Sequence, residues 1–97
     1  MSLEEIASYC EFLDCEVSIG DPDVGFIRVD GSGVSRRFNN YRRFLAHNEL
    51  SGLPKPRKVL SQATVFRILR DGEQMRELSR EEFEGELEAF QRKVGSR

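Results

Sequence analysis

One stretch decides the fold: TVFRILRDGEQMREL, residues 64–78. Two partly apolar runs flank the pair Asp71-Gly72. Asp-Gly between apolar runs is a strong hairpin signal, because a two-residue type I′ turn needs a positive φ at both of its central positions. The stretch therefore predicts a strand around 64–69, a turn at Asp71-Gly72 and a return strand around 74–78.

The two-residue turn also predicts which residues face each other across this hairpin. The same register sets two arginines directly opposite each other, which is unfavourable, and it also sets two pairs of apolar residues directly opposite each other, which is favourable. The expected pairs are Ile68 with Met75, Val65 with Leu78, and Arg67 with Arg76.

A helix over residues 61–70 is the alternative interpretation. The residues LSQATVFRIL, 60–69, contain the spacing Ser-x-x-Thr-Val-x-Arg-x-Leu. This spacing resembles the turn and recognition helix of helix-turn-helix repressors of the LacI type. The resemblance implies a DNA-binding helix whose Gln62, Thr64 and Arg67 reach base edges and phosphates in the major groove. It covers residues 60–69 alone, and Pro54-Lys55-Pro56 stands where the preceding helix of the family should lie.

The flanking segments supply further elements. Ser2 and Glu5 have the spacing of a capping box and begin a helix expected over Ser2–Asp14. Strands are expected at Glu16–Ile19 and Val24–Asp30, on either side of turn residues. Gly31-Ser32-Gly33 breaks the chain before a second helix, expected from Ser35 to about Asn48 with Ser35 as its N-cap.

The last helix is expected over Ser79–Val94. Ser79 and Glu82 repeat the capping-box spacing. Phe83, Leu87, Phe90 and Val94 form one apolar stripe at helical spacing. Residues 51–56 are expected to form a loop, because two prolines bracket one lysine.

These elements predict a single domain over residues 1–97 of the α+β class. Two hairpins would form one small antiparallel sheet with three helices packed on it. The alternative, with a helix in place of the second hairpin, makes the C-terminal half of the chain all-helical.

Charge is unevenly distributed along the chain. Residues 1–35 carry a net charge of −7, residues 36–70 carry +8, and residues 71–97 carry −3, within a total of −2. Such asymmetry is typical of a surface for an anionic partner, although the basic segment could instead pair with the acidic flanks inside the fold.

The basic segment 36–70 is therefore the candidate contact with nucleic acid or another polyanion. Glycines before Arg36 and Arg37 could also help to hold an anion at a helix N-terminus. The candidate residues are Arg36, Arg37, Arg42, Arg43, Lys55, Arg57, Lys58, Gln62, Thr64 and Arg67.

The sequence favours a non-enzymatic binding or regulatory protein. His47 is the single histidine and lies among arginines, and no nucleophile–base arrangement accompanies it. Cys10 and Cys15 with that one histidine fall short of the four ligands of a structural zinc site, so we expect no metal and no cofactor. The alternative function is a protein–protein interaction module or self-associating adaptor, with a homodimer among its forms.

The sequence also suggests a compartment. No apolar run approaches the roughly 20 residues that a membrane span needs. The acidic start of the chain is unlike a signal peptide, and the two cysteines suit free thiols. We therefore expect a cytoplasmic protein without a membrane partner.

Overall fold

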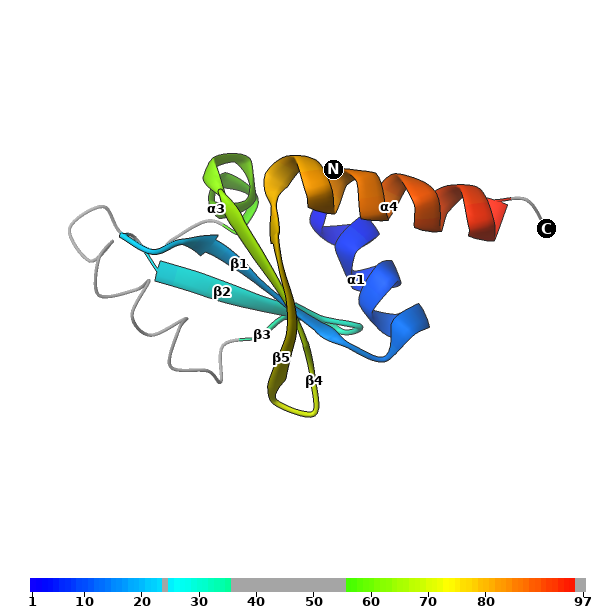
Figure 1. Cartoon of the computed structure of the whole chain (residues 1–97), viewed down its shortest axis with the longest axis horizontal. Helices are drawn as coiled ribbons and strands as arrows, with labels where there is room; N and C mark the ends of the chain where they lie inside the picture. The colour runs from blue at the N-terminus through cyan, green and yellow to red at the C-terminus, as the bar shows by residue number, and fades with distance from the viewer. Residues whose placement is uncertain (24, 36–55, 96–97) are drawn as a thin grey trace.

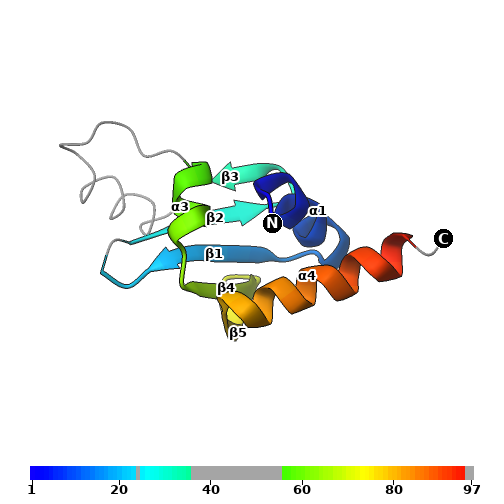
Figure 2. The same cartoon turned by 90° about the horizontal axis from the view of Figure 1, so that it is seen from above.

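The computed structural model describes residues 1–23, 25–35 and 56–95. Its elements are α1 Leu3–Leu13, β1 Glu16–Asp21, β2 Gly25–Asp30, β3 Gly33–Ser35, α3 Pro56–Gln62, β4 Val65–Arg70, β5 Glu73–Ser79 and α4 Arg80–Gly95. The strands form one antiparallel sheet in the order β3-β2-β1-β4-β5. The helices lie on one face of this sheet (Figures 1 and 2). The predicted α+β class with a small antiparallel sheet is confirmed.

The core lies between the helices and that face of the sheet. Alternate residues of the central strands point into it, as Val17 and Ile19 do on β1. Phe83 of α4 stacks on Phe66 of β4, with ring centroids 4.7 Å apart and an interplanar angle of 9°. Phe83 also meets Tyr9 of α1 edge-on at 5.7 Å. One aromatic cluster thus joins both long helices to the sheet.

The hairpin predicted for residues 64–78 is confirmed, and so is its turn. Asp71 and Gly72 have φ angles of 54° and 81°, as a type I′ turn requires. Residues 65–70 are a strand, so the recognition helix implied by the LacI-type resemblance does not form.

The predicted register of this hairpin is wrong beyond its first pairs. Leu69 pairs with Gln74, but Ile68 pairs with Arg76, so Met75 is an extra residue in a β-bulge. The bulge shifts the rest of β5 by one residue, which moves each side chain to the other face.

This shift resolves the charge conflict of the regular register. Arg67 now faces Glu77 instead of Arg76, and Arg67 Nε lies 2.8 Å from Glu77 Oε1. Leu78 faces Phe66 and joins the core. The bulge therefore replaces a repulsive pair with an ion pair and places Leu78 on the core face of the sheet.

Both long helices begin at the predicted caps. The Ser2 hydroxyl accepts a hydrogen bond from the Glu5 N–H at 3.1 Å. At α4 the capping box is reciprocal: Ser79 Oγ accepts from the Glu82 N–H at 3.2 Å, and Glu82 Oε1 accepts from the Ser79 N–H at 2.9 Å. The Ser79 contacts hold the pKa of Glu82 below its usual value.

The connection between the two hairpins differs from the prediction. Residues 33–35 form the edge strand β3, so the glycine turn leads into a strand and not directly into a helix. The rest of the helix expected at 35–48 lies outside the described residues. Pro56, expected in a loop, begins α3, because proline is tolerated in the first turn, where the helix has no use for its missing N–H.

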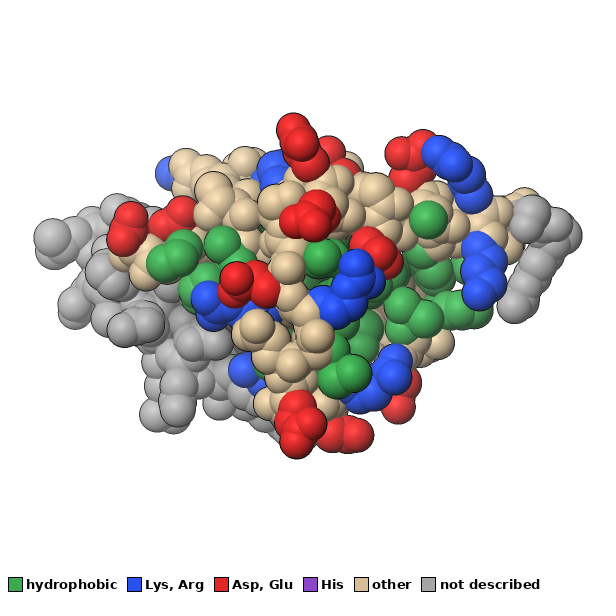
Figure 3. All heavy atoms as spheres, viewed as in Figure 1, with side chains coloured by type: hydrophobic (Ala, Val, Ile, Leu, Met, Phe, Trp, Pro, Cys, Tyr) green, Lys and Arg blue, Asp and Glu red, His purple; other side chains and the backbone are tan. Residues whose placement is uncertain are grey.

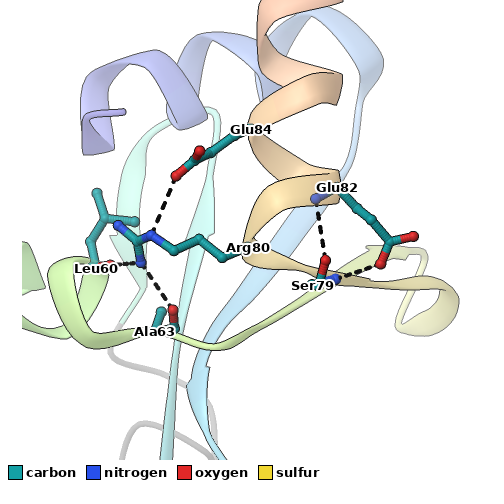
Figure 4. A network of polar contacts seen from close by, with 6 residues as sticks. All are labelled: Leu60, Ala63, Ser79, Arg80, Glu82 and Glu84. Atoms are coloured by element: carbon teal, nitrogen blue, oxygen red, sulfur yellow. Dashed lines mark hydrogen bonds and ion pairs between the residues drawn. The ribbon is translucent and has the colours of Figure 1, made fainter.

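Arg80 connects α3 to α4 (Figure 4). Its Nη1 donates to the carbonyl oxygens of Leu60 at 2.7 Å and Ala63 at 2.9 Å. Its Nε lies 3.3 Å from Glu84 Oε1. Arg80 thus satisfies carbonyl groups at the end of α3, where a helix leaves its last acceptors unpaired. Within the described ranges, no helix has the length and apolar character to cross a membrane.

Candidate functional site

Half of the predicted polyanion-binding residues can be placed. Arg57 and Lys58 lie exposed on α3, and Gln62 ends that helix. Thr64 follows α3, and Arg67 lies on β4. The remaining candidates lie outside the described residues: Arg36, Arg37, Arg42, Arg43 and Lys55.

The placed candidates are largely engaged within the fold. Arg57 Nη2 lies 2.7 Å from Glu4 Oε1 of α1. The pKa of Glu4 is lowered mainly by a backbone hydrogen bond and secondly by the charge of Arg57. Arg67 pairs with Glu77 and also stacks over Phe26, with its Cζ 4.4 Å from the ring centroid. Thr64 Oγ1 donates to Asp21 Oδ2 at 2.9 Å. The charge pattern allowed basic residues to pair with the acidic flanks inside the fold, and such pairing occurs at Arg57 and at Arg67.

The described part of the chain is acidic as a whole. Residues 1–23, 25–35 and 56–95 carry sixteen carboxylates and nine basic side chains, a net charge of −7. A surface that attracts polyanions is usually basic. The described surface therefore offers little long-range attraction for nucleic acid.

The glycine turn is built by a local side-chain contact. Asp30 Oδ1 accepts a hydrogen bond from the Ser32 N–H at 2.7 Å, which is an Asx turn. The carboxylate thus already occupies an N–H that an anion would need. Arg36 and Arg37, the other members of the predicted anion site, lie outside the described residues.

A different surface stands out: large apolar side chains are exposed where α1, α4 and the β4–β5 hairpin meet. Phe12 is 47% exposed and Met75 is 58% exposed. Phe12 meets Phe90 edge-on at 5.4 Å, and Val94 follows one turn along α4 and is also exposed. We call Phe12, Met75, Phe90 and Val94 the apolar surface.

Met75, one residue of the apolar surface, borders a cleft of about 230 Å³. Figure 3 shows hydrophobic side chains gathered between α4 and the hairpin on this side of the molecule. Tyr9 lies in the cleft wall, and burial raises its pKa to about 12, so its phenol stays neutral. Arg76 and Glu86 border the cleft as an ion pair at 2.9 Å.

A second cavity, of about 410 Å³, lies at the end of the sheet that carries the β2–β3 and β4–β5 turns. The two cysteines line this cavity together with mostly polar residues from the α1–β1, β2–β3 and β4–β5 connections and the ends of the elements beside them. The lining residues are Cys10, Glu11, Asp14, Cys15, Glu16, Asp30, Gly31, Ser32, Leu69, Arg70 and Asp71. Both cysteines are free thiols and both are buried. Cys15 also borders the smaller cleft, so the two cavities meet at this residue.

Sequence reasoning missed both features. Phe12 lies outside the apolar stripe of the first helix, and a large apolar residue off the stripe is a signal that could have identified the exposed surface. Met75 reaches its exposed position through the bulge, which periodicity does not reveal. Cys10 is 1% exposed and belongs to the core.

Comparison with known proteins identified no relative of this chain. No family model matches the chain, and neither a curated protein nor a solved structure matches it.

Proposed function

We propose that this protein is a non-enzymatic interaction module that pairs with a second copy of itself through the apolar surface. The observation that carries the proposal is the exposure of Phe12 on α1, of Val94 on α4, and of Met75 at the edge of a cleft that both helices also line. Exposed apolar side chains that gather around a cleft are typical of protein–protein contact sites, where aromatic and methionine side chains are enriched.

The charge pattern of α4 favours a second copy as the partner. The first turn of α4 holds Glu81 and Glu82, and its last turn holds Arg92 and Lys93. In a two-fold pair the same surface meets itself. Two α4 helices packed antiparallel would place the basic end of one beside the acidic end of the other.

The test is the mass of the protein in solution. We expect light scattering after size exclusion to give twice the chain mass. Phe12→Ser and Met75→Ser should each raise the dissociation constant at least about 10-fold, because anchor residues at such contacts contribute about 2 kcal/mol or more. Both side chains are exposed, so the fold should survive each change.

Gln74→Ser is the matched control, because Gln74 adjoins Met75 on β5 but does not border the cleft. It should pair as the unchanged protein does. A chain that stays monomeric at about 1 mM, a concentration at which even weak pairing is visible, would overturn the proposal. Unchanged pairing in both serine variants would overturn it as well.

Polyanion contact through segment 36–70 is the second candidate function. The net charge of +8 in this segment favours polyanion contact. Within residues 56–70, the part of the segment that the structure describes, Arg57 and Lys58 are exposed. Release of counterions from a bound polyanion would supply the affinity.

Salt dependence tests this candidate. Arg57→Glu with Lys58→Glu should flatten the slope of log affinity against log salt by about one for each lost phosphate contact. Arg92→Glu with Lys93→Glu makes the same change in net charge at the far end of the chain and should leave the slope nearly unaltered. Equal slopes in the two double variants, or no binding of DNA, RNA or heparin at low salt, would contradict this function.

A further inference from the structure

The end of α1 holds Cys10 and Cys15 side by side. Asp14 adopts the left-handed conformation, with φ 53° and ψ 56°. The N–H of the next residue, Cys15, donates to the Cys10 carbonyl at 3.0 Å. This six-to-one bond after a left-handed residue is the Schellman motif, whose first and last residues commonly touch. In this chain those two residues are both cysteines.

The motif brings the two cysteines within reach of a disulfide. A 3.0 Å hydrogen bond between their backbones places their Cα atoms within about 7 Å by standard bond lengths. Disulfides span Cα separations of about 4.4–6.8 Å. Both side chains line the same cavity, and each cysteine is the main influence on the pKa of the other. Little backbone movement is therefore needed to join the sulfurs.

The two thiols differ in their surroundings. Cys10 is enclosed by the core, and its Sγ lies 3.5 Å from the Val29 carbonyl oxygen, to which it donates. Both cysteines line the larger cavity, but Cys15 also borders the smaller cleft and is more exposed, at 8% against 1% for Cys10, so a small reagent reaches Cys15 more easily. Arg70 borders both cavities too, and its Nη2 donates to the Leu13 carbonyl at 2.7 Å.

These surroundings make Cys15 the better nucleophile. The Cys10 side chain and the Arg70 charge lower the pKa of Cys15, whereas the neighbouring Cys15 and burial raise the pKa of Cys10. The thiolate is the form that reacts with oxidants. Cys15 is thus the sulfur that would attack an oxidant, and Cys10 is the sulfur that would then form the disulfide with it.

We propose that Cys10 and Cys15 form a peroxide-reactive dithiol, with Cys15 as the attacking sulfur and Cys10 as the resolving one. The Cys15 thiolate attacks one oxygen of a hydroperoxide, the O–O bond breaks, and the leaving oxygen takes a proton, which leaves a sulfenic acid on Cys15. The Cys10 sulfur then attacks the sulfenic sulfur and displaces hydroxide, which takes the Cys10 proton and departs as water. With hydrogen peroxide, two thiols become one disulfide and the peroxide becomes two waters.

The proposal rests on the local geometry of this motif and does not depend on self-association. The experiment treats the whole folded chain with hydrogen peroxide and follows it by intact mass. We expect the loss of two hydrogen atoms, the loss of both titratable thiols, and migration as a single chain on a non-reducing gel. Reduction with dithiothreitol should restore both thiols.

Two variants separate the roles of the sulfurs. In Cys10→Ala, the oxidation of Cys15 should stop at the sulfenic acid, which dimedone traps as an adduct. In Cys15→Ser, the Cys10 thiol should be oxidised at a rate at least about 10-fold lower than the rate at which the unchanged protein loses its first thiol. The reason is that a buried thiol of raised pKa is inert. Circular dichroism of each variant before treatment establishes that it is folded.

Three results would overturn the proposal, and the first two need no variant. One is retention of both thiols under peroxide that oxidises a free cysteine peptide. Another is the formation of disulfides between chains only. The third is equal oxidation rates in the two single-cysteine variants, which would show that the site does not distinguish attacking from resolving sulfur.

Discussion

Replacing Phe83 by alanine should lower the free energy of unfolding by about 3–5 kcal/mol, the range for a buried phenylalanine. Phe83 is 0% exposed, stacks on Phe66 and meets Tyr9 edge-on. The truncation removes these contacts and leaves a cavity where α1, α4 and β4 meet. Domains of this size are stable by only about 5–15 kcal/mol, so the variant should unfold at much lower urea concentration.

Phe12→Ala provides the matched control for this experiment. The same atoms are removed, but Phe12 is 47% exposed and its ring contact is with Phe90 at the margin of the core. At protein concentrations where the chain is monomeric, we expect a loss well under half of that at Phe83, because less apolar area leaves the protein interior. Equal urea midpoints for Phe83→Ala and the unchanged protein would mean that α4 does not pack on the sheet as described.

Replacing Arg80 by alanine should lower the free energy of unfolding by about 1–3 kcal/mol. This is the range for hydrogen bonds to a charged group, with its lower end set by the partial exposure of Arg80. The change removes the donor that joins the carbonyl groups of Leu60 and Ala63 to the first turn of α4 (Figure 4). Those two acceptors then have to find water at the end of α3. Urea unfolding measures the loss, and amide exchange should increase first in α3.

Arg92→Ala is the control for Arg80, because both arginines pair with a glutamate one turn away on α4. Arg92 pairs with Glu88 and is 75% exposed, and exposed pairs of this kind contribute about 0.3–0.5 kcal/mol. The difference between the two variants therefore reports the carbonyl contacts alone. Equal losses would show that Arg80 does not stabilise the α3–β4 connection.

Local signals in the sequence were sufficient for most of the fold. Ser79 and Glu82 begin α4 because a capping box satisfies its own backbone groups without help from distant residues. The turn at Asp71-Gly72 follows in the same way from the φ angles that those residues tolerate. The stripe that contains Phe83 and Leu87 identified the buried face of α4, since helical spacing alone places those residues on one side.

The sites depended on contacts between residues far apart in the chain. The basic candidates looked available in the sequence, yet Arg57 meets Glu4 of α1 and Thr64 meets Asp21 of β1. Sequence reasoning allowed such pairing in general and could not assign its partners, because local patterns carry no information on which surfaces meet. The cysteine pair was visible as a spacing, but its contact required the helix to end at Asp14 in the left-handed conformation.

The sequence by itself determined the local elements: two capped helices, two hairpins and the apolar stripes that join them. Only the tertiary structure decided the bulge at Met75, the start of α3 at Pro56 and the exposure of Phe12. The physical reason is the range of the interactions. Caps, turns and periodicity act within a few residues, whereas the bulge sets Arg67 against Glu77 and aligns Leu78 with Phe66 in a core built from the whole chain.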